Sequence, residues 1–391
     1  MPNRIWIILV TILVLLSLIS IPILYVLNIE EKPPEGFFFG VSYGLSTVDE
    51  AKLLIDKVKD YTNFFIVNNW DISTNETALT EICDYAVQAG LTFIIFFDYI
   101  DVSSHVYPWH HQWVFSGKDW WGDKFAGIYI YEEPGGKQID IGLFDEFHDE
   151  RAKMYENVTT YTEAAQIFVN QLPMGLSFSF LQSINSTKFV SDYALYWFDY
   201  LAGYDTVFAE LGWNHSTPQQ IGLCRGAAKA QNKDWGTIIT WKSQREDPAS
   251  IKTGPEMLED MFISFEAGAK YVVVFNFPRF PEDSPFGILT EEHFSAMEQF
   301  WEYTSKHPED YGKTNGNVAF VLPKDYGWGM RRPDDNIWLP DWGPDERSPL
   351  IWSNMNKLIE KYDLELDIVY DDQRFNYENY NEIYLWNATI D

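Results

Sequence analysis

The feature that most constrains this chain is a regular alternation of short apolar segments with longer amphipathic ones over most of its 391 residues. The short segments have the length and composition of strands, and the longer ones have the apolar spacing of helices. This alternation is typical of a parallel sheet covered by helices. The expected strands are Phe37–Tyr43, Asn63–Asn69, Leu91–Asp98, Phe125–Glu133, Met174–Phe180, Asp205–Leu211, Gly236–Trp241 and Lys270–Asn276.

A helix is expected after nearly every strand. The expected helices are Thr47–Tyr61, Glu76–Gly90, Thr160–Leu172, Ser191–Leu201, Pro218–Asn232, Pro255–Ala269 and Thr290–Thr304. The number of strands and the length of the segment, close to the typical value of about 250 residues, predict an α/β fold, a (β/α)8 TIM barrel over residues 37–312. His105–Asp123, rich in Trp and His, interrupts the rhythm and is expected to be a long loop at the barrel mouth.

A second, smaller unit follows the barrel. Residues 317–391 are expected to form a small α/β domain. Its expected elements are strands Val318–Leu322, Leu366–Val369 and Ile383–Trp386 and helix Pro349–Tyr362. Residues 325–343 are dense in Trp, Arg and Asp, and two interpretations are open: the segment closes over the barrel mouth, or it packs between the two domains.

The first 30 residues predict a transmembrane anchor, with residues 31–36 as a linker. Ile5–Asn28 carries no charge and, at about 1.5 Å per residue, is long enough for a hydrocarbon core of about 30 Å. A cleaved signal peptide is less favoured, because the run is too long and no Ala-x-Ala-like site follows. Arg4 before the run, and Glu30 and Glu31 after it, predict a single-pass protein of the cell membrane. Its N-terminus would be cytoplasmic and its main domain extracytoplasmic.

Composition narrows the classes of partner. A formal net charge of −30 argues against nucleic acid and against anionic lipid head groups. Several of the 16 tryptophans stand in Gly- and Pro-rich segments, where exposed aromatic rings suit the apolar faces of sugars. Asn-x-Ser/Thr triplets at Asn75, Asn157, Asn185, Asn214 and Asn387 give weak support for an exported glycoprotein. Cys83 and Cys224 are expected to be small buried residues that form neither a disulfide nor a metal site.

The fourth expected strand carries the strongest functional signal. It runs into Glu132 and Glu133 and stops at Pro134-Gly-Gly, because proline cannot donate to a strand ladder. Parallel barrels build their active sites at the C-terminal ends of their strands. The period of two places Tyr129, Tyr131 and Glu133 on the inner face. This favours Glu133 as the inward acid, with Glu132 as the alternative.

The other strand ends complete a candidate site. The candidate catalytic residues are Glu133, Glu132, Glu210 and Asp98, and the candidate substrate-binding residues are Tyr43, Asn69, Trp70, Tyr131, Trp213, Trp241, Lys242 and Asn276. Strands four and six are two apart, so their carboxyls are expected at about 5–8 Å, within reach of the separations used by glycosidases. No cofactor is expected. His105, His110 and His111 near Asp98 and Asp101 lack any recognised metal-ligand spacing.

With strand four ending in glutamate and a small α/β domain after the barrel, the chain resembles the clan A barrel glycoside hydrolases over residues 37–391. Its last domain looks like the one that follows the barrel in some β-galactosidase families. The resemblance implies an acid/base at Glu132 or Glu133, although Tyr131 stands where the clan has asparagine. The clan nucleophile ends strand seven, but here Ile238-Ile-Thr-Trp-Lys242 has no carboxylate. Either Glu210 takes that role, or both catalytic groups lie near Glu132–Glu133, as in barrel endo-mannosidases with two close glutamates.

These observations predict a membrane-anchored, extracytoplasmic glycoside hydrolase acting on a poly- or oligosaccharide through paired carboxylates. Because one fold hosts many functions, a non-catalytic cell-surface glycan-binding protein on the same barrel is the alternative. A surface assembly factor, with its mouth filled by residues 328–342, is a third possibility.

Overall fold

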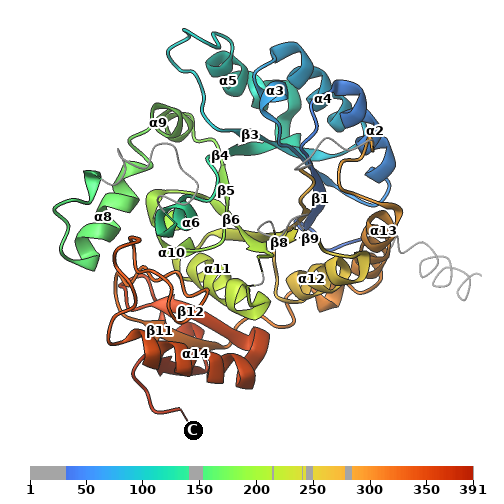
Figure 1. Ribbon diagram of the computed structural model, residues 1–391. Helices are drawn as coiled ribbons and strands as arrows, with labels where there is room; N and C mark the ends of the chain where they lie inside the picture. Colours follow the sequence, from blue (N-terminus) through green and yellow to red (C-terminus); the bar gives the residue numbers. More distant parts are fainter. Residues whose placement is uncertain are drawn as a thin grey trace, which may run out of the picture.

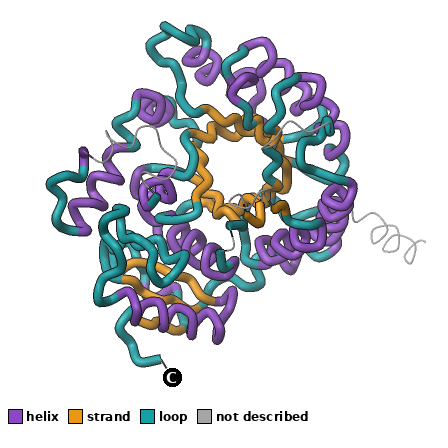
Figure 2. Tube along the Cα trace, viewed as in Figure 1, coloured by secondary structure: helices purple, strands orange, loops and turns teal. Residues whose placement is uncertain are grey.

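The computed structural model describes residues 32–140, 153–213, 215–239, 241–243, 250–277 and 284–390. Eight parallel strands close a barrel in the order β1-β10-β7-β6-β5-β4-β3-β2, with helices around it (Figures 1 and 2). The barrel strands are β1 (Phe38–Tyr43), β2 (Phe64–Val67), β3 (Thr92–Phe97), β4 (Phe125–Ile130), β5 (Lys188–Asp192), β6 (Thr206–Leu211), β7 (Asp234–Ile239) and β10 (Tyr271–Val274). The predicted (β/α)8 barrel is therefore confirmed.

Side chains that alternate along the strands fill the barrel interior. The buried interior residues are Phe64, Ile66, Ile94, Tyr129, Phe189, Phe208, Ile238, Tyr271 and Val273. Residues at the intervening positions pack outward against the helices, as the period of two requires. Because the lumen is filled, a site on this barrel has to lie at one of its ends.

The helices begin at good capping residues. Thr47, Thr160 and Thr253 each accept a backbone N–H bond at a helix N-terminus. The longer helices are α2 (Val48–Val58), α4 (Glu76–Gln88), α5 (His110–Trp121), α8 (Tyr161–Gln171), α9 (Leu176–Ser183), α11 (Thr217–Gln231), α12 (Gly254–Glu266) and α13 (Glu291–Lys306). The shorter elements are α3 (Trp70–Ser73), α6 (Pro134–Ile139), α10 (Tyr196–Ala202) and the hairpin β8 (Trp241–Ser243) with β9 (Ser250–Ile251).

The structure differs from the sequence-based expectation at two elements. Met174–Phe180 was expected to be the fifth strand, but Leu176–Ser183 is helix α9, and the strand is Lys188–Asp192. The alternation of Ser and Phe after Gly175 imitates a strand, whereas the true strand is a short, fully buried run. His105–Asp123 is not all loop, since it contains α5, whose buried face includes Trp113, Val114 and Trp121.

The C-terminal unit is a small parallel sheet with one long helix. Strands β11 (Val318–Leu322), β12 (Leu366–Tyr370) and β13 (Glu382–Leu385) pair in the order β12-β11-β13, beside α14 (Ser348–Tyr362). It lies against the barrel next to α10 and α11 (Figure 1). Arg225 of α11 donates to the buried Asp367 at 2.7 Å and to backbone carbonyls at the edge of the small sheet. The unit is thus fastened to the barrel by a buried ion pair.

Residues 325–343 pack between the two units. Trp328 and Trp338 are buried, and the Trp338 ring lies 4.6 Å from Phe198 of α10 and 5.8 Å from Phe168 of α8. Of the two interpretations of this segment, these contacts favour interdomain packing.

The predicted transmembrane anchor consists of residues that the structure does not describe. The predicted anchor, Ile5–Asn28, lies outside the described ranges. Within those ranges, none of the helices combines the length and apolar character needed to span a bilayer.

Candidate active site

Three glutamates meet at the C-terminal end of the barrel. Glu132 and Glu133 follow β4, and Glu210 is the penultimate residue of β6, where it is 5% exposed. The two side chains lie close enough for the charge of Glu210 to act on Glu133. Acids carried by strands four and six therefore meet at one mouth, as their place at the strand ends led us to expect.

Glu210 is held by neutral donors. Ser191 Oγ, on the neighbouring strand β5, donates to Oε1 at 2.7 Å, and Trp213 Nε1 donates to Oε2 at 2.9 Å. Ser191 in turn bonds the hydroxyl of the interior residue Tyr129 at 2.7 Å. Because these donors stabilise the ionised form, they oppose the effect of burial on the Glu210 pKa, which is nevertheless raised.

Glu133 lies in a different environment. Burial, and then the negative charge of Glu210 and Glu132, raise its pKa well above the usual 4.5. Its nearest cation is Lys137, whose Nζ is 3.8 Å from Oε2. Of two neighbouring buried carboxyls, the one that accepts hydrogen bonds ionises more readily, so the surroundings favour the charge on Glu210 and the proton on Glu133. The pair thus combines a proton donor with a proton acceptor.

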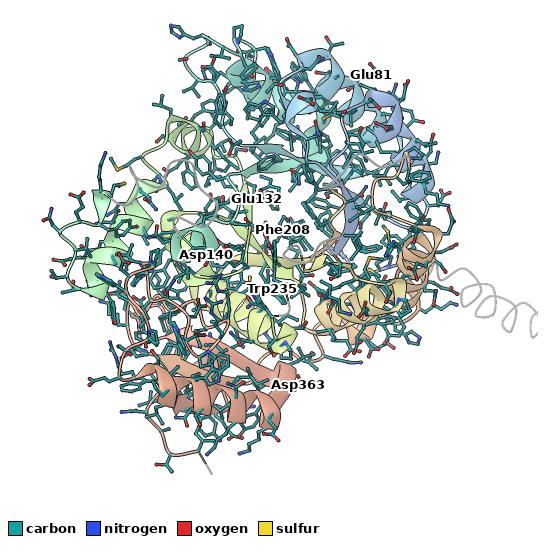
Figure 3. The ribbon with its side chains drawn as sticks, in the orientation of Figure 1. Glu81, Glu132, Asp140, Phe208, Trp235 and Asp363 are labelled. Atoms are coloured by element: carbon teal, nitrogen blue, oxygen red, sulfur yellow. The ribbon has the colours of Figure 1, made fainter. Side chains whose placement is uncertain are left out.

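Glu132 also faces the barrel axis. Its pKa is raised by burial first and also by the charges of Glu210 and Asp98. Figure 3 labels Glu132 together with Phe208 of the barrel interior. The strict alternation used to favour Glu133 breaks at this strand end, since Tyr131 and Glu133 have φ of 59° and 50°. Both glutamates therefore reach the mouth.

The turn after Glu133 is docked on β5. Glu133 N donates to Ser191 O at 3.0 Å, and Gly135 N and Gly136 N donate to the Asp192 carboxylate at 2.6 and 2.8 Å. Glycine is required here, because a Cβ on Gly135 would lie 2.4 Å from Ala194 O.

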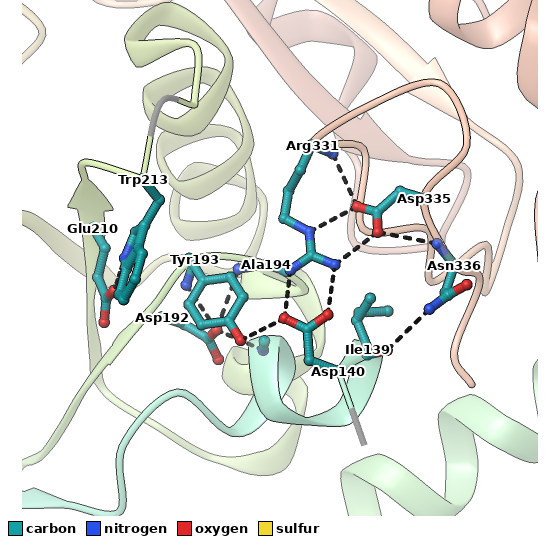
Figure 4. Close-up of polar contacts among 11 residues, drawn as sticks. Ile139, Asp140, Asp192, Tyr193, Ala194, Glu210, Trp213, Arg331, Asp335 and Asn336 are labelled. Atoms are coloured by element: carbon teal, nitrogen blue, oxygen red, sulfur yellow. Dashed lines mark hydrogen bonds and ion pairs between the residues drawn. The ribbon is translucent and has the colours of Figure 1, made fainter. Parts of the chain in front are cut away.

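The C-terminal unit reaches the same turn. Arg331 donates to Asp140 at 2.7 and 3.0 Å and to Asp335 at 2.7 Å, and Tyr193 donates to Asp140 at 3.0 Å (Figure 4). Asp140 directly follows α6, the helix that starts after Glu133. The interdomain segment and the candidate acids therefore share one network.

An aromatic cluster stands at the mouth beside β3. Trp70 is 40% exposed, and its ring lies 5.5 Å from Tyr99 and 6.3 Å from Tyr107. Asp98, at the end of β3, is exposed, and its charge acts on Glu132 and Tyr131. The Tyr131 side chain points toward Gly175, where an added Cβ would meet its hydroxyl at 2.4 Å.

Three predicted sugar-binding residues make hydrogen bonds within the fold. Tyr43 is fully buried, and its hydroxyl accepts from Thr47 N at 2.8 Å. Asn69 caps α3 through Ile72 N and donates to Gly44 O at 3.0 Å. Asn276 is fully buried and accepts from Ile288 N at 3.1 Å. Backbone groups thus satisfy the Tyr43 hydroxyl, the Asn69 amide and the Asn276 Oδ1, whereas the buried Asn276 Nδ2 has no hydrogen-bond partner among the described residues. Substrate binding by these three residues stays a prediction.

The predicted residues after strand seven belong to a hairpin. The barrel strand β7 ends at Ile239, and Lys242 belongs to the hairpin strand β8. Lys242 Nζ pairs with Glu256 of α12 at 2.6 Å. The side chain of Trp241 lies outside the described part of the structure. Lys242 is therefore tied to a helix rather than aimed along the barrel axis.

Sequence reasoning missed Ser191, Asp192, Tyr193 and Arg331. The first two end β5, and the misplaced fifth strand put Ser191 at the start of a helix. A usable signal was present, since Lys188-Phe-Val-Ser-Asp192 is an apolar run ending in an acid, as at Asp98. Arg331 is remote in sequence and carries no local signal.

No protein-family model matches the chain, and no curated protein does. Among solved structures, GH5_18 from Streptomyces cattleya in complex with GlcNAc matches with a TM-score of 0.52 at 11% identity, over 91% of this chain and 99% of that chain. An endo-1,4-beta-mannanase from Rhizomucor miehei matches with a TM-score of 0.42 at 13% identity, over 69% of this chain and 95% of that chain. The GH99 endo-alpha-mannosidase from Bacteroides thetaiotaomicron matches with a TM-score of 0.42 at 13% identity, over 68% of this chain and 86% of that chain.

These similarities concern the fold. The barrel is of the kind found in glycoside hydrolases, and barrel enzymes of other classes match as well. At these identities the site has to be judged from its own geometry.

Trp70→Ala is expected to raise KM for a sugar substrate about 2- to 12-fold, with kcat within about twofold, because stacking on an aromatic ring contributes about 0.5–1.5 kcal/mol. Trp120→Ala is the matched control, since Trp120 is 51% exposed on the outer helix α5. Initial rates against substrate concentration would test this. Equal KM values for the two variants would exclude Trp70 as a sugar platform.

Proposed function

We propose that this protein is a glycoside hydrolase in which Glu133 is the general acid and Glu210 the base or nucleophile. The observation that carries the proposal is the convergence of these two acids at the barrel mouth in unlike environments, since Glu210 accepts from Ser191 and Trp213 while the charge of Glu210 and burial raise the pKa of Glu133. Glycosidic cleavage needs this division, because one group protonates the leaving oxygen while the other attacks or activates water.

Substrate would set the spacing of the pair. Retaining glycosidases hold their carboxyls about 5–5.5 Å apart and inverting ones hold them farther apart. We expect a bound sugar to set the separation of Glu133 and Glu210.

The proposal includes anchoring at the cell membrane with the barrel outside. The uncharged Ile5–Asn28 run and its flanking charges support it. In cells, protease added outside is expected to degrade the barrel while an N-terminal cytoplasmic tag survives. A barrel that is protected until the cells are lysed would overturn this orientation.

Reducing-end release tests the activity itself. The purified full-length chain would be assayed on a panel of polysaccharides and glycoprotein glycans, beside a Glu133→Gln/Glu210→Gln double variant. Release by the wild type alone would establish a hydrolase. No release on any substrate, with binding to one glycan, would instead support the alternative of a glycan-binding protein.

The pH dependence follows from the two environments. The rate should rise as Glu210 ionises and fall as Glu133 loses its proton, giving a bell-shaped kcat/KM profile. The pKa of Glu210 is raised, so the rate should start to rise only above pH 4.5. The pKa of Glu133 is raised well above 4.5, so the rate should fall only at a pH well above that value. A profile that peaks below pH 4.5 would contradict the assignment.

A further inference from the structure

A buried amide without a hydrogen bond lies at the mouth end of β2. Asn68 is 4% exposed, and its side-chain amide makes no hydrogen bond with any group in the described part of the chain. Its backbone is fixed, since Asn68 N donates to Tyr43 O at 2.8 Å. Neither amide atom is sealed from solvent, in contrast to Asn276 Nδ2. Because a buried amide without partners costs free energy, such a group calls for a partner from outside the chain.

Alternation along β2 directs Asn68 into the barrel mouth. Phe64 and Ile66 belong to the cluster that fills the barrel interior, and Asn68 is the next residue on this face. The backbone is still extended at Asn69, with φ of −146° and ψ of 133°, so the alternation continues past the end of the strand. Asn69 accordingly points the other way, to the backbone of α3 and of Gly44. Of the two neighbouring asparagines, Asn68 is therefore the one whose amide faces the mouth unpaired.

The place of β2 in the barrel sets Asn68 beside the candidate site. β2 pairs with β3, and β3 pairs with β4, the strand that leads to Glu132 and Glu133. At a strand spacing of about 4.8 Å, the ends of β2 and β4 lie about 9–10 Å apart. Asp98 follows the strand between them, and the exposed Trp70 follows Asn68 by two residues. The amide thus lies on the side of the mouth where the aromatic platform stands, across from the acids.

We propose that Asn68 binds two neighbouring hydroxyl groups of the sugar and thereby selects the substrate. An amide carries an acceptor oxygen and a donor NH2 group side by side. Each hydroxyl both donates and accepts, so a vicinal diol satisfies both ends of the amide together. The choice of a sugar as the ligand rests on the proposed function. The unpaired state of the amide in the free protein does not.

The first test is the stability of the free protein. Asn68→Leu replaces an unpaired amide by an apolar group of similar size, so the unfolding constant should stay equal or fall. Asn69→Leu is the matched comparison, because Asn69 caps α3 and donates to Gly44 O. Its unfolding constant should rise about 2- to 30-fold, as expected for a lost helix cap. A rise in Asn68→Leu as large as in Asn69→Leu would overturn the inference.

The second test is sugar binding by the full-length chain. The probes are the methyl glycosides of glucose, galactose and mannose, measured by calorimetry. At least one should bind the wild type, and Asn68→Leu should raise its Kd at least tenfold. Asn356→Leu is the control, since Asn356 is exposed on α14, and it should bind as the wild type does.

Monodeoxy analogues of the bound glycoside locate the contact. Removing either of two neighbouring hydroxyls should raise the wild-type Kd at least tenfold, because the buried amide then loses a partner. The same removal should change the Kd of Asn68→Leu less than twofold, as a double-mutant cycle requires of groups in contact. Equal losses of affinity in the wild type and in Asn68→Leu would overturn the assignment.

Binding and hydrolysis fail separately. A chain that releases no sugar but binds one through Asn68 keeps this inference and loses the proposed function. A hydrolase whose kcat/KM is unchanged in Asn68→Leu keeps the function and loses the inference. A chain that neither binds nor releases sugar loses both.

Discussion

Glu133→Gln is expected to lower kcat about 10²–10⁴-fold on a natural glycoside, the range over which general acid catalysis acts. Glutamine keeps the shape of the side chain but has no acidic proton. Glu133 is assigned as the acid because burial and two neighbouring carboxylates keep its pKa high. Glu210→Gln is expected to cause a loss of similar size, since the pair acts as a unit.

The leaving group separates the two roles. An aryl glycoside with a good leaving group needs little protonation, so Glu133→Gln should regain most of its rate on it. Glu210→Gln should stay inactive on both substrates. Glu132→Gln is the matched control, and its kcat should fall less than tenfold. A larger loss in Glu132→Gln than in Glu133→Gln would transfer the acid role to Glu132.

Arg331→Met is expected to lower the free energy of unfolding by about 3–5 kcal/mol, because removing one partner from a buried ion pair leaves the other charge uncompensated. Arg331 is 9% exposed, and it pairs with Asp140 and Asp335, whose side chains are 4% and 0% exposed. Methionine keeps most of the apolar stem but none of the donors.

Arg374→Met is the comparison for this stability measurement. Arg374 is 42% exposed and pairs with Asp372 at 2.9 Å, so its loss should cost about 0–1 kcal/mol. Urea unfolding of both variants would measure the difference. If Arg331→Met were no worse than Arg374→Met, the interdomain network would not hold the α6 turn in place.

The barrel could be predicted from local patterns because each βα unit buries its own apolar stripe against its neighbours. The strand in Phe125–Ile130 and the helix in Val48–Val58 are visible in their periodicity. The fifth strand was misplaced because Leu176–Ser183 alternates like a strand and nevertheless folds as a helix, packing Phe178 and Leu181 inward. Over so few residues, tertiary packing outweighs the local pattern.

The sequence by itself determined that acids stand at strand ends, because Glu132, Glu133 and Glu210 close apolar runs that a parallel barrel brings to one mouth. Only the tertiary structure decided which groups touch. It brings Glu133 near Glu210, places Ser191 beside Glu210, and bonds Tyr43 and Asn276 to the backbone. The physical reason is that protonation and hydrogen bonding depend on burial and on partners distant in the chain, such as Ser191 beside Glu210 and Arg331 beside Asp140.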